Sequence, residues 1–327
     1  MKLFAFSLRD FDELGFLEEL SQELGFEFGW TAEYPSLENA HLAEGADALS
    51  IMTNPMTPEL LDCYRSMGIK AIATRSIGYD HIDLEYAHKI GMRVGHAAYP
   101  PESVANYAIM LMLMTLRRVP FILSQNAVQD FSLEGKLGRD ISSCTVGVVG
   151  TGAIGACVIR HLTGFGCRIL AYDPFEKEEL KDIATYTNLQ TLLEQSDAVT
   201  LHAPGLPPNH HMIGAPELAS MKQGAVIVNA ARGSLIDTGA LIDSLESGHL
   251  GGAALDTIEH ESNLYYLDKT REILPNRDRA VLMALPNVIV SPHMAFYTHD
   301  DVKGMVCNST RALIAFVNGE ESPFEVR

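Results

Sequence analysis

The stretch Thr145-Val146-Gly147-Val148-Val149-Gly150-Thr151-Gly152-Ala153-Ile154-Gly155 decides the fold of this chain. Its first five residues predict a short buried strand, and the apolar spacing over residues 154–165 predicts a helix directly after it. Between the two lies a G-x-G-x-x-G pattern. Alone this pattern is a weak signal, but a strand that enters it and a helix that leaves it make it specific. The stretch therefore predicts a dinucleotide-binding βα unit.

Each glycine of the pattern has a separate physical task. Gly150 permits the tight turn, Gly152 lets the backbone approach a pyrophosphate, and Gly155 lets the helix pack closely on the strand. The helix N-terminus then offers free N–H groups to the phosphates. Asp173 ends the next predicted strand, where its carboxylate would bind ribose hydroxyls and repel a 2′-phosphate. No Arg or Lys stands at positions 174–176, so we expect NAD as the cofactor in preference to NADP.

Short apolar strands and helices alternate on both sides of this stretch. Strands are expected at 3–6, 48–52, 71–74 and 93–96, then at 168–172, 198–202, 225–229, 252–255 and 288–291. Helices are expected at 11–24, 58–67, 84–90 and 102–118, with one of about 20 residues from Thr298. Such alternation predicts an α/β fold with two doubly wound, parallel-sheet domains. The polar segment 259–279 is expected to be a long loop, and long loops are often functional.

Composition excludes several classes of protein. The chain has 327 residues, 47% hydrophobic and 20% charged, which is a globular balance. Its 24 basic and 42 acidic residues give a net charge of −18, which repels nucleic acid and anionic membranes. The longest apolar run, 107–114, is far shorter than the ~20 residues that a membrane span needs. We therefore expect a chain with neither nucleic acid nor membrane as a partner.

The spacing of the cysteines and histidines argues against disulfides and metal sites. The five cysteines are scattered and never spaced C-x-x-C, so buried thiols in a reducing cytoplasm are expected. Among the 12 histidines, His260 precedes Glu261 without a second His at helical spacing, and the adjacent His210 and His211 cannot share a helix face. No metal site is predicted.

Three polar residues follow three separate strands of the second series. Arg232 lies just past the strand at 225–229, Glu261 follows the strand at 252–255, and His293 follows the strand at 288–291. Ligands of open parallel sheets bind beyond the carboxyl ends of the strands. Each residue also has a structural alternative: a surface ion pair for Arg232, a buried core position for His293, and a solvated acid for Glu261. Their shared placement after a dinucleotide motif favours a catalytic group.

At this point a family resemblance is visible. The chain resembles the NAD-dependent D-2-hydroxyacid dehydrogenases, in particular the D-lactate dehydrogenases and their subgroup associated with vancomycin resistance. The resemblance runs from the first strand to the last helix, and beyond the three polar residues it rests on these motifs: Thr74-Arg75-Ser76-Ile77-Gly78 with His81-Ile82-Asp83, Tyr99-Pro100-Pro101-Glu102-Ser103-Val104-Ala105, and Thr145 to Gly152. Pro100 and Asn106 depart from the family's usual residues.

The resemblance implies the domain plan and the binding residues. It implies a Rossmann cofactor domain at 100–297, inserted into a flavodoxin-like substrate domain formed by 1–99 and 298–327. By position, it implies NAD contacts from Ala153, Ile154, Asp173, Ala203, Pro204, Asn209, Ala230, Arg232 and Asp256, besides the three glycines. It also implies substrate contacts from Ile77, Gly78, Tyr99, Arg232, His293 and Phe296, with Met52 near another pocket position. The family usually forms homodimers through the region of the apolar helix after Pro101, and an interdomain core helix stays open as the alternative interpretation of this helix.

The mechanism expected from this family follows from charge. Arg232 suits the carboxylate of a 2-keto acid because its guanidinium is planar and always charged, and the backbone N–H groups of Ile77 and Gly78 would form a second clamp. His293 would protonate the keto oxygen as hydride arrives from NADH. Glu261 would orient the imidazole and favour its charged form. Asp256 would face the nicotinamide carboxamide.

The expected activity is the reversible, NADH-dependent reduction of a small 2-keto acid, with pyruvate favoured, to the D-2-hydroxy acid. A pocket that includes Tyr99 and Phe296 suits a small side chain, but phenylpyruvate stays open, because each methylene changes binding by only ~1–3 kcal/mol. Acidic keto acids are disfavoured, because these segments hold no second cation besides Arg75. Related formate and phosphoglycerate dehydrogenases fit the motifs and the length less well. An NAD(H)-sensing corepressor-like binding protein is the alternative from another class.

Overall fold

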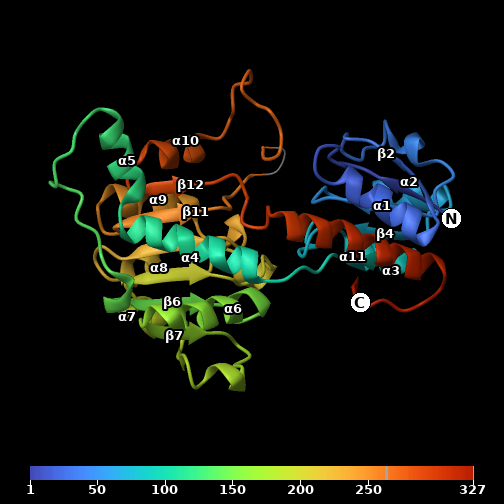
Figure 1. The fold of residues 1–327 in the computed structure, drawn as a ribbon. Helices are drawn as coiled ribbons and strands as arrows, with labels where there is room; N and C mark the ends of the chain where they lie inside the picture. The colour runs from blue at the N-terminus through green and yellow to red at the C-terminus, as the bar shows by residue number, and fades with distance from the viewer. Residues whose placement is uncertain (262–263, 327) are drawn as a thin grey trace. The chain divides into compact units, whose positions relative to one another are not determined.

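The computed structural model describes residues 1–261 and 264–326. The chain divides into two compact units. One unit comprises Met1–Pro100 together with the C-terminal segment from Tyr297, and the other comprises Pro101–Phe296 (Figure 1). Each unit is built on its own β-sheet.

The second unit holds a seven-stranded sheet in which every pair of neighbouring strands is parallel. Its order is β12-β11-β10-β9-β6-β7-β8. The strands are β6 (Thr145–Val149), β7 (Arg168–Tyr172), β8 (Thr185–Tyr186), β9 (Ala198–Leu201), β10 (Val226–Asn229), β11 (Gly252–Leu255) and β12 (Val288–Val290). The direction of chain progression reverses between β6 and β9. This is the doubly wound order with its switch point beside the glycine turn.

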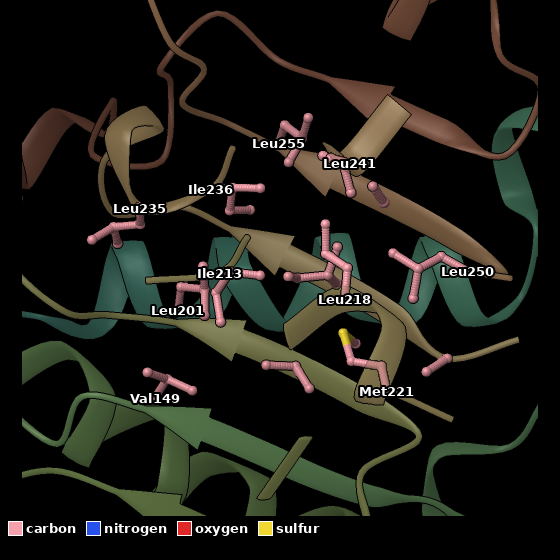
Figure 2. Close-up of a cluster of buried hydrophobic side chains, with 14 of the residues drawn as sticks. Val149, Leu201, Ile213, Leu218, Met221, Leu235, Ile236, Leu241, Leu250 and Leu255 are labelled. Atoms are coloured by element: carbon pink, nitrogen blue, oxygen red, sulfur yellow. The ribbon is translucent and has the colours of Figure 1, made fainter. Parts of the chain in front are cut away.

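Helices cover both faces of this sheet because successive strand residues point in opposite directions. Val226 and Val228 join the core under α4 (Glu102–Leu116) and α6 (Ala153–Leu162). Ile227 joins the core on the other face, under α7 (Leu189–Gln195), α8 (Ala215–Ser220), α9 (Thr238–Glu246) and α10 (Arg277–Ala284). Figure 2 shows the second of these cores, where Leu218 and Leu241 lie among the side chains of Val149, Leu201 and Leu255. The unit is thus a three-layer α/β/α domain.

The first unit has a six-stranded sheet in the order β13-β5-β4-β3-β1-β2. Its strands are β1 (Lys2–Ala5), β2 (Glu27–Trp30), β3 (Ala48–Ile51), β4 (Ala71–Thr74), β5 (Arg93–Gly95) and β13 (Glu325–Val326). The first five are parallel in the flavodoxin-like order 2-1-3-4-5, whereas β13 pairs antiparallel with β5. One face packs with α2 (Pro58–Ser66) and α3 (Leu84–Lys89), and the other with α1 (Leu14–Leu24) and α11 (His299–Val317).

The predicted fold class, two doubly wound α/β domains, is confirmed, with differences in detail. β2, β8, β13 and the helix α5 (Val119–Ala127) were not expected from the sequence. Strands of two residues carry no periodicity, so β8 and β13 are visible only through their partners. The expectation of a loop over the whole of 259–279 was wrong at its end, because α10 begins at Arg277 after the cap residue Asn276. The first turn of α10 consists of charged residues, which gave no apolar periodicity to indicate a helix. Residues 262 and 263 of that segment lie outside the described residues.

Helix α4 is the apolar helix after Pro101 that the family resemblance places at a homodimer interface. It packs against α6 and against strands β9 to β12 of its own unit, and its buried side chains include Ile109, Leu111 and Met112. The homodimer stays a prediction. Over residues 1–261 and 264–326, no single helix is long and apolar enough to cross a membrane, while α4 and α5, bent by 61° at their junction, pass that test only as a pair and only by length and composition.

Candidate active site

The glycine turn after β6 has the geometry that its sequence requires. Gly150 has a φ of 89°, a left-handed conformation that strains any residue with a Cβ. A Cβ at this position would also lie 2.7 Å from the backbone carbonyl carbon of His202. A Cβ on Gly155 would lie 1.9 Å from the carbonyl oxygen of Gly150, whereas a Cβ on Gly152 would meet nothing within 4 Å. Gly150 and Gly155 are thus required by the fold, and Gly152 faces open space.

The open side of this turn is the start of α6, whose cap residue is Gly152. The first N–H groups of a helix have no intrahelical acceptor, so this end is suited to an anion. Asp173, just past β7, accepts hydrogen bonds from the backbone N–H groups of Thr151 (2.6 Å) and Phe175 (2.9 Å). The carboxylate therefore lies next to the turn, as expected for a group that binds an adenosine ribose. A carboxylate has about four acceptor positions, so these two bonds leave it acceptor capacity.

His202 directly follows β9 and packs against the glycine turn. Its Nε2 lies 2.9 Å from the hydroxyl oxygen of Thr200. Burial lowers the pKa of the imidazole from 6.5 to about 4, because the charged form is poorly solvated there. The ring is therefore neutral at neutral pH and serves as packing under the glycine turn.

Arg232, Glu261 and His293 follow β10, β11 and β12, and these three strands are neighbours in the sheet. All three strands are parallel, so their carboxyl ends meet at one edge. The backbone of Arg232 is fixed by Asn229, whose side-chain amide donates to its carbonyl at 2.8 Å. The backbone of Gly233 packs closely against the segment before Glu261, since a Cβ on Gly233 would lie 2.1 Å from the carbonyl carbon of Ile258. The turn after β10 and the segment after β11 are packed in direct contact.

His293 and Glu261 form a hydrogen-bonded pair. The Nδ1 atom of His293 lies 2.8 Å from Oε1 of Glu261, and the second carboxylate oxygen accepts from the backbone N–H of Ile258 at 3.0 Å. Both side chains are about one-quarter exposed, at 24% and 22%. The imidazole is therefore oriented by an acid while part of it stays open to solvent. This is the arrangement of a general acid–base group with an orienting partner.

The backbone at His293 is held in an uncommon conformation. Its φ is 54°, and its N–H donates to the carbonyl oxygen of Asp256 at 2.8 Å. The carboxylate of Asp256 accepts from the Ser291 hydroxyl (2.6 Å) and from the backbone N–H groups of Met294 and Ala295 (2.9 Å each). On the other side, the hydroxyl of Tyr266 donates to the carbonyl of His293 at 2.8 Å. Two neighbours therefore fix the strained turn that aims the imidazole.

Asp256 has a role in the structure that sequence reasoning missed. Its side chain is fully buried and both oxygens accept hydrogen bonds within the turn at 291–295. The expected contact of Asp256 with a nicotinamide carboxamide stays a prediction. Tyr266 was also missed, because a tyrosine in a polar loop carries no sequence signal for a contact 27 residues away.

The remaining expected cofactor contacts lie close to the same strand ends. Ala203 and Pro204 follow β9, where the Asn209 side-chain amide donates to the Pro204 carbonyl at 2.9 Å, and Ala230 follows β10. Ala153 and Ile154 open α6. Their contacts with NAD stay predictions.

The expected substrate residues fall in both units. In the first unit, Ile77 and Gly78 follow β4, Met52 follows β3 and is buried, and Tyr99 is half-buried. In the second unit, Phe296 is buried, and its ring centre lies 6.4 Å from that of His293. Their contacts with a substrate stay predictions.

Comparison with known proteins identifies the family. A family model described as "D-isomer specific 2-hydroxyacid dehydrogenase, NAD binding domain" matches residues 109–295, which is more than half of the chain. The chain belongs to this family. The predicted family, the NAD cofactor and the NAD-dependent dehydrogenase activity are thereby confirmed. The match lies wholly within the second unit, which carries the glycine turn and the His293–Glu261 pair.

Relatives of this dehydrogenase are named for different activities. It is 44% identical over 264 residues to a D-specific alpha-keto acid dehydrogenase of Enterococcus faecalis, covering 80% of each chain. It is 39% identical over 309 residues to an aromatic 2-oxoacid reductase of Clostridium sporogenes, covering 94% of this chain and 93% of the relative. Among solved structures, a D-lactate dehydrogenase of Treponema pallidum matches with a TM-score of 0.89 at 31% identity over the full length of both chains.

The dehydrogenase's own residues fit its dinucleotide. The start of α6 carries no side chain at Gly152 and opens on free space, which a pyrophosphate needs for close approach. Asp173 places a carboxylate beside that turn. A dinucleotide held there by the start of α6 and Asp173 would supply the hydride.

Proposed function

We propose that this dehydrogenase reduces a small monocarboxylic 2-keto acid, with pyruvate as the first candidate, to the D-2-hydroxy acid, and that it also catalyses the reverse reaction. The observation that carries the proposal is the 2.8 Å contact between His293 and Glu261 on strand ends adjacent to that of Arg232. An acid, its orienting partner and a cation for a carboxylate are the groups that this reaction needs.

His293 acts in this proposal as the acid in reduction and the base in oxidation. Because Nδ1 faces Glu261, Nε2 is the nitrogen that exchanges a proton with the substrate oxygen. Negative charge develops on that oxygen during reduction, and a positioned imidazolium neutralises it. Glu261 keeps the ring in one orientation, and its charge stabilises the imidazolium. The fixed backbone at His293, between Asp256 and Tyr266, keeps the proton donor in place from one turnover to the next.

Arg232 binds the carboxylate of the keto acid. A guanidinium offers two parallel N–H donors to a carboxylate, which fixes both position and orientation. The backbone at Arg232 is anchored by Asn229 and by the tight packing of Gly233, so the fork is presented from a rigid turn.

A second carboxylate on the substrate is disfavoured by the state of Arg75. Its side chain is 1% exposed and donates to the Glu13 carboxylate, the Ser50 hydroxyl and the carbonyls of Phe6 and Ser7. A cation that is fully engaged in this way is not available to a ligand. Arg75, the only second cation expected near the substrate from the sequence, is therefore not available to a second substrate carboxylate. This supports monocarboxylic substrates.

An aromatic 2-keto acid is the second candidate. The ring of Tyr266 lies 6.3 Å from that of His293 and 6.0 Å, edge-on, from that of Phe296. An aromatic side chain gains from such ring neighbours. A relative named aromatic 2-oxoacid reductase, 39% identical to this dehydrogenase, supports the same candidate.

The test is NADH oxidation with a panel of keto acids and chiral analysis of the product. Pyruvate, 2-ketobutyrate, phenylpyruvate and 2-ketoglutarate differ in size, aromaticity and charge. We expect the highest kcat/KM for pyruvate, the D-isomer as product, and the lowest value for 2-ketoglutarate. A higher kcat/KM for phenylpyruvate would select the second candidate, and slow turnover of every substrate with tight NADH binding would select the sensor alternative. Equal turnover with NADPH would contradict the role of Asp173.

A further inference from the structure

Two consecutive histidines outside the catalytic group lie side by side. His210 and His211 follow the short 3₁₀ turn Pro207–Asn209, and their ring centres are 3.9 Å apart with 30° between the planes. Adjacent side chains usually diverge, but His211 has a φ of 52°, which turns the backbone and brings both rings to the same side. The two rings are therefore neighbours although the residues do not share a helix face.

A carboxylate from a distant segment completes the group. Oε1 of Glu259 lies 2.7 Å from Nε2 of His211. One ligand atom from each of His210, His211 and Glu259 can be chosen so that all three lie within 4.8 Å of one another. His210 is exposed, whereas the side chains of His211 and Glu259 are 34% and 15% exposed. The group therefore lies near the surface of the second unit, with two partly buried donors, His211 and Glu259, and one exposed donor, His210, that is free to rotate.

The fixed donors are themselves held by further groups. The second oxygen of Glu259 accepts from the backbone N–H (3.0 Å) and the hydroxyl (2.7 Å) of Thr238. The other ring nitrogen of His211 lies 3.9 Å from a carboxylate oxygen of Asp237. Metal-binding histidines commonly have a carboxylate behind the second nitrogen, and metal-binding carboxylates are commonly hydrogen-bonded in turn. The hydrogen bonds behind Glu259 are present here, whereas the Asp237 carboxylate lies on the second-nitrogen side of His211 but beyond hydrogen-bond distance.

We propose that His210, His211 and Glu259 bind a divalent transition-metal ion of the Zn²⁺ class, with water completing the coordination. Zn–N and Zn–O bonds are about 2.0–2.2 Å long, so tetrahedral donors lie a little over 3 Å apart. The 2.7 Å contact between His211 and Glu259 has to open by about 0.6–0.9 Å. The ion takes the place of the proton between these two atoms, which is released to water, and the exposed His210 closes onto the ion by side-chain rotation.

The donor set determines the class of ion. Two imidazoles and one carboxylate suit Zn²⁺, Ni²⁺ or Cu²⁺, whereas Mg²⁺ and Ca²⁺ prefer oxygen ligands. None of the three residues is assigned to proton transfer or to substrate binding, so this inference does not depend on the proposed substrate.

The test is calorimetric titration of untagged, chelator-stripped enzyme with Zn²⁺, and separately with Mg²⁺. We expect one Zn²⁺ per chain, no comparable Mg²⁺ binding, and a Zn²⁺ affinity that falls by more than about tenfold in His210→Ala. This variant leaves the His211–Glu259 contact intact and changes an exposed side chain, so folding is preserved. Glu259→Gln should weaken Zn²⁺ binding as well, while Gln still accepts from Thr238.

The matched control is His41→Ala, which removes an exposed histidine from the first unit and should bind Zn²⁺ as the unchanged enzyme does. Substituting Co²⁺ gives a second readout, because tetrahedral Co²⁺ absorbs visible light far more strongly than hexahydrated Co²⁺. Unchanged Zn²⁺ affinity in His210→Ala would overturn the proposal and assign the binding to thiols or other surface groups. Absence of saturable Zn²⁺ binding in the unchanged enzyme would overturn it too.

Discussion

The Nδ1 atom of His293 lies 2.8 Å from Oε1 of Glu261, although the two residues are 32 positions apart in the chain. Parallel pairing of β11 with β12 brings their carboxyl ends together, and the hydrogen bonds of Asp256 and Tyr266 then fix the turn at His293. The His293–Glu261 contact is therefore a product of strand adjacency followed by local fixation of one strained residue.

Replacing Glu261 by Gln tests the pair directly. Gln can still contact Nδ1, but it carries no charge to stabilise an imidazolium. We expect kcat for reduction to fall by about tenfold to a hundredfold, and the rate to begin its decline at a lower pH than in the unchanged enzyme. The measurement is the pH profile of NADH oxidation. Glu272→Gln, on the same polar segment and paired only with Lys269 among the described residues, is the control, and an identical profile for Glu261→Gln would remove Glu261 from the mechanism.

Replacing Arg232 by Lys tests carboxylate binding. A single ammonium replaces a two-pronged fork, so one charge-assisted hydrogen bond worth about 1.5–3 kcal/mol is lost. KM for the keto acid should rise by about tenfold to a hundredfold, with a smaller change in kcat. Steady-state kinetics at saturating NADH measure this split. The same exchange at the exposed Arg168, which contacts Gln195, should leave KM unchanged. A wild-type KM in Arg232→Lys would show that another group holds the carboxylate.

Alanine at two glycines of the turn separates folding from cofactor binding. In Gly155→Ala the new Cβ meets the carbonyl oxygen of Gly150 at 1.9 Å, so the helix must shift and stability should fall by about 1–3 kcal/mol. In Gly152→Ala the Cβ meets nothing within 4 Å, so stability should be unchanged. NADH affinity should nevertheless fall by about tenfold, because the methyl occupies the approach to the pyrophosphate. Thermal unfolding and NADH fluorescence titration distinguish the two, and wild-type NADH affinity in Gly152→Ala would place the pyrophosphate elsewhere.

His202 predicts a pH dependence of stability. Its pKa is lowered by burial from 6.5 to about 4, so between these values the unfolded chain binds a proton that the folded chain does not. Stability from this group is complete above pH 6.5 and is lost as the pH falls toward 4. The residue as a whole keeps some solvent exposure, which reduces the effect of the shift, and we expect a loss of about 2 kcal/mol. Urea unfolding between pH 7 and pH 4 should show that His202→Gln loses less stability than the unchanged enzyme. Equal losses in both proteins would contradict a neutral His202 in the folded state.

Much of this molecule follows from its sequence alone. The parallel strands, the glycine turn and the placement of Arg232, Glu261 and His293 after three strands of one series are local features. Apolar periodicity and the steric needs of glycine act over a few residues, so they are legible without a structure. The separate tasks of Gly150 and Gly155 are local features of this kind, because each follows from the spacing of the glycines between a strand and a helix.

Tertiary contacts alone decided the rest. The burial of Arg75 against Glu13, the turn-holding role of Asp256, and the meeting of His211 with Glu259 all join segments that are 38 to 62 residues apart in the chain. The antiparallel pairing of β13 with β5 joins segments that lie much farther apart, near the ends of the two stretches of chain that form the first unit. Such contacts depend on which strand ends and loops are brought together when the sheets form, and no local pattern encodes the partner. The chemistry of each side chain was readable from the chain, but whether that side chain meets a ligand or another residue was settled by packing.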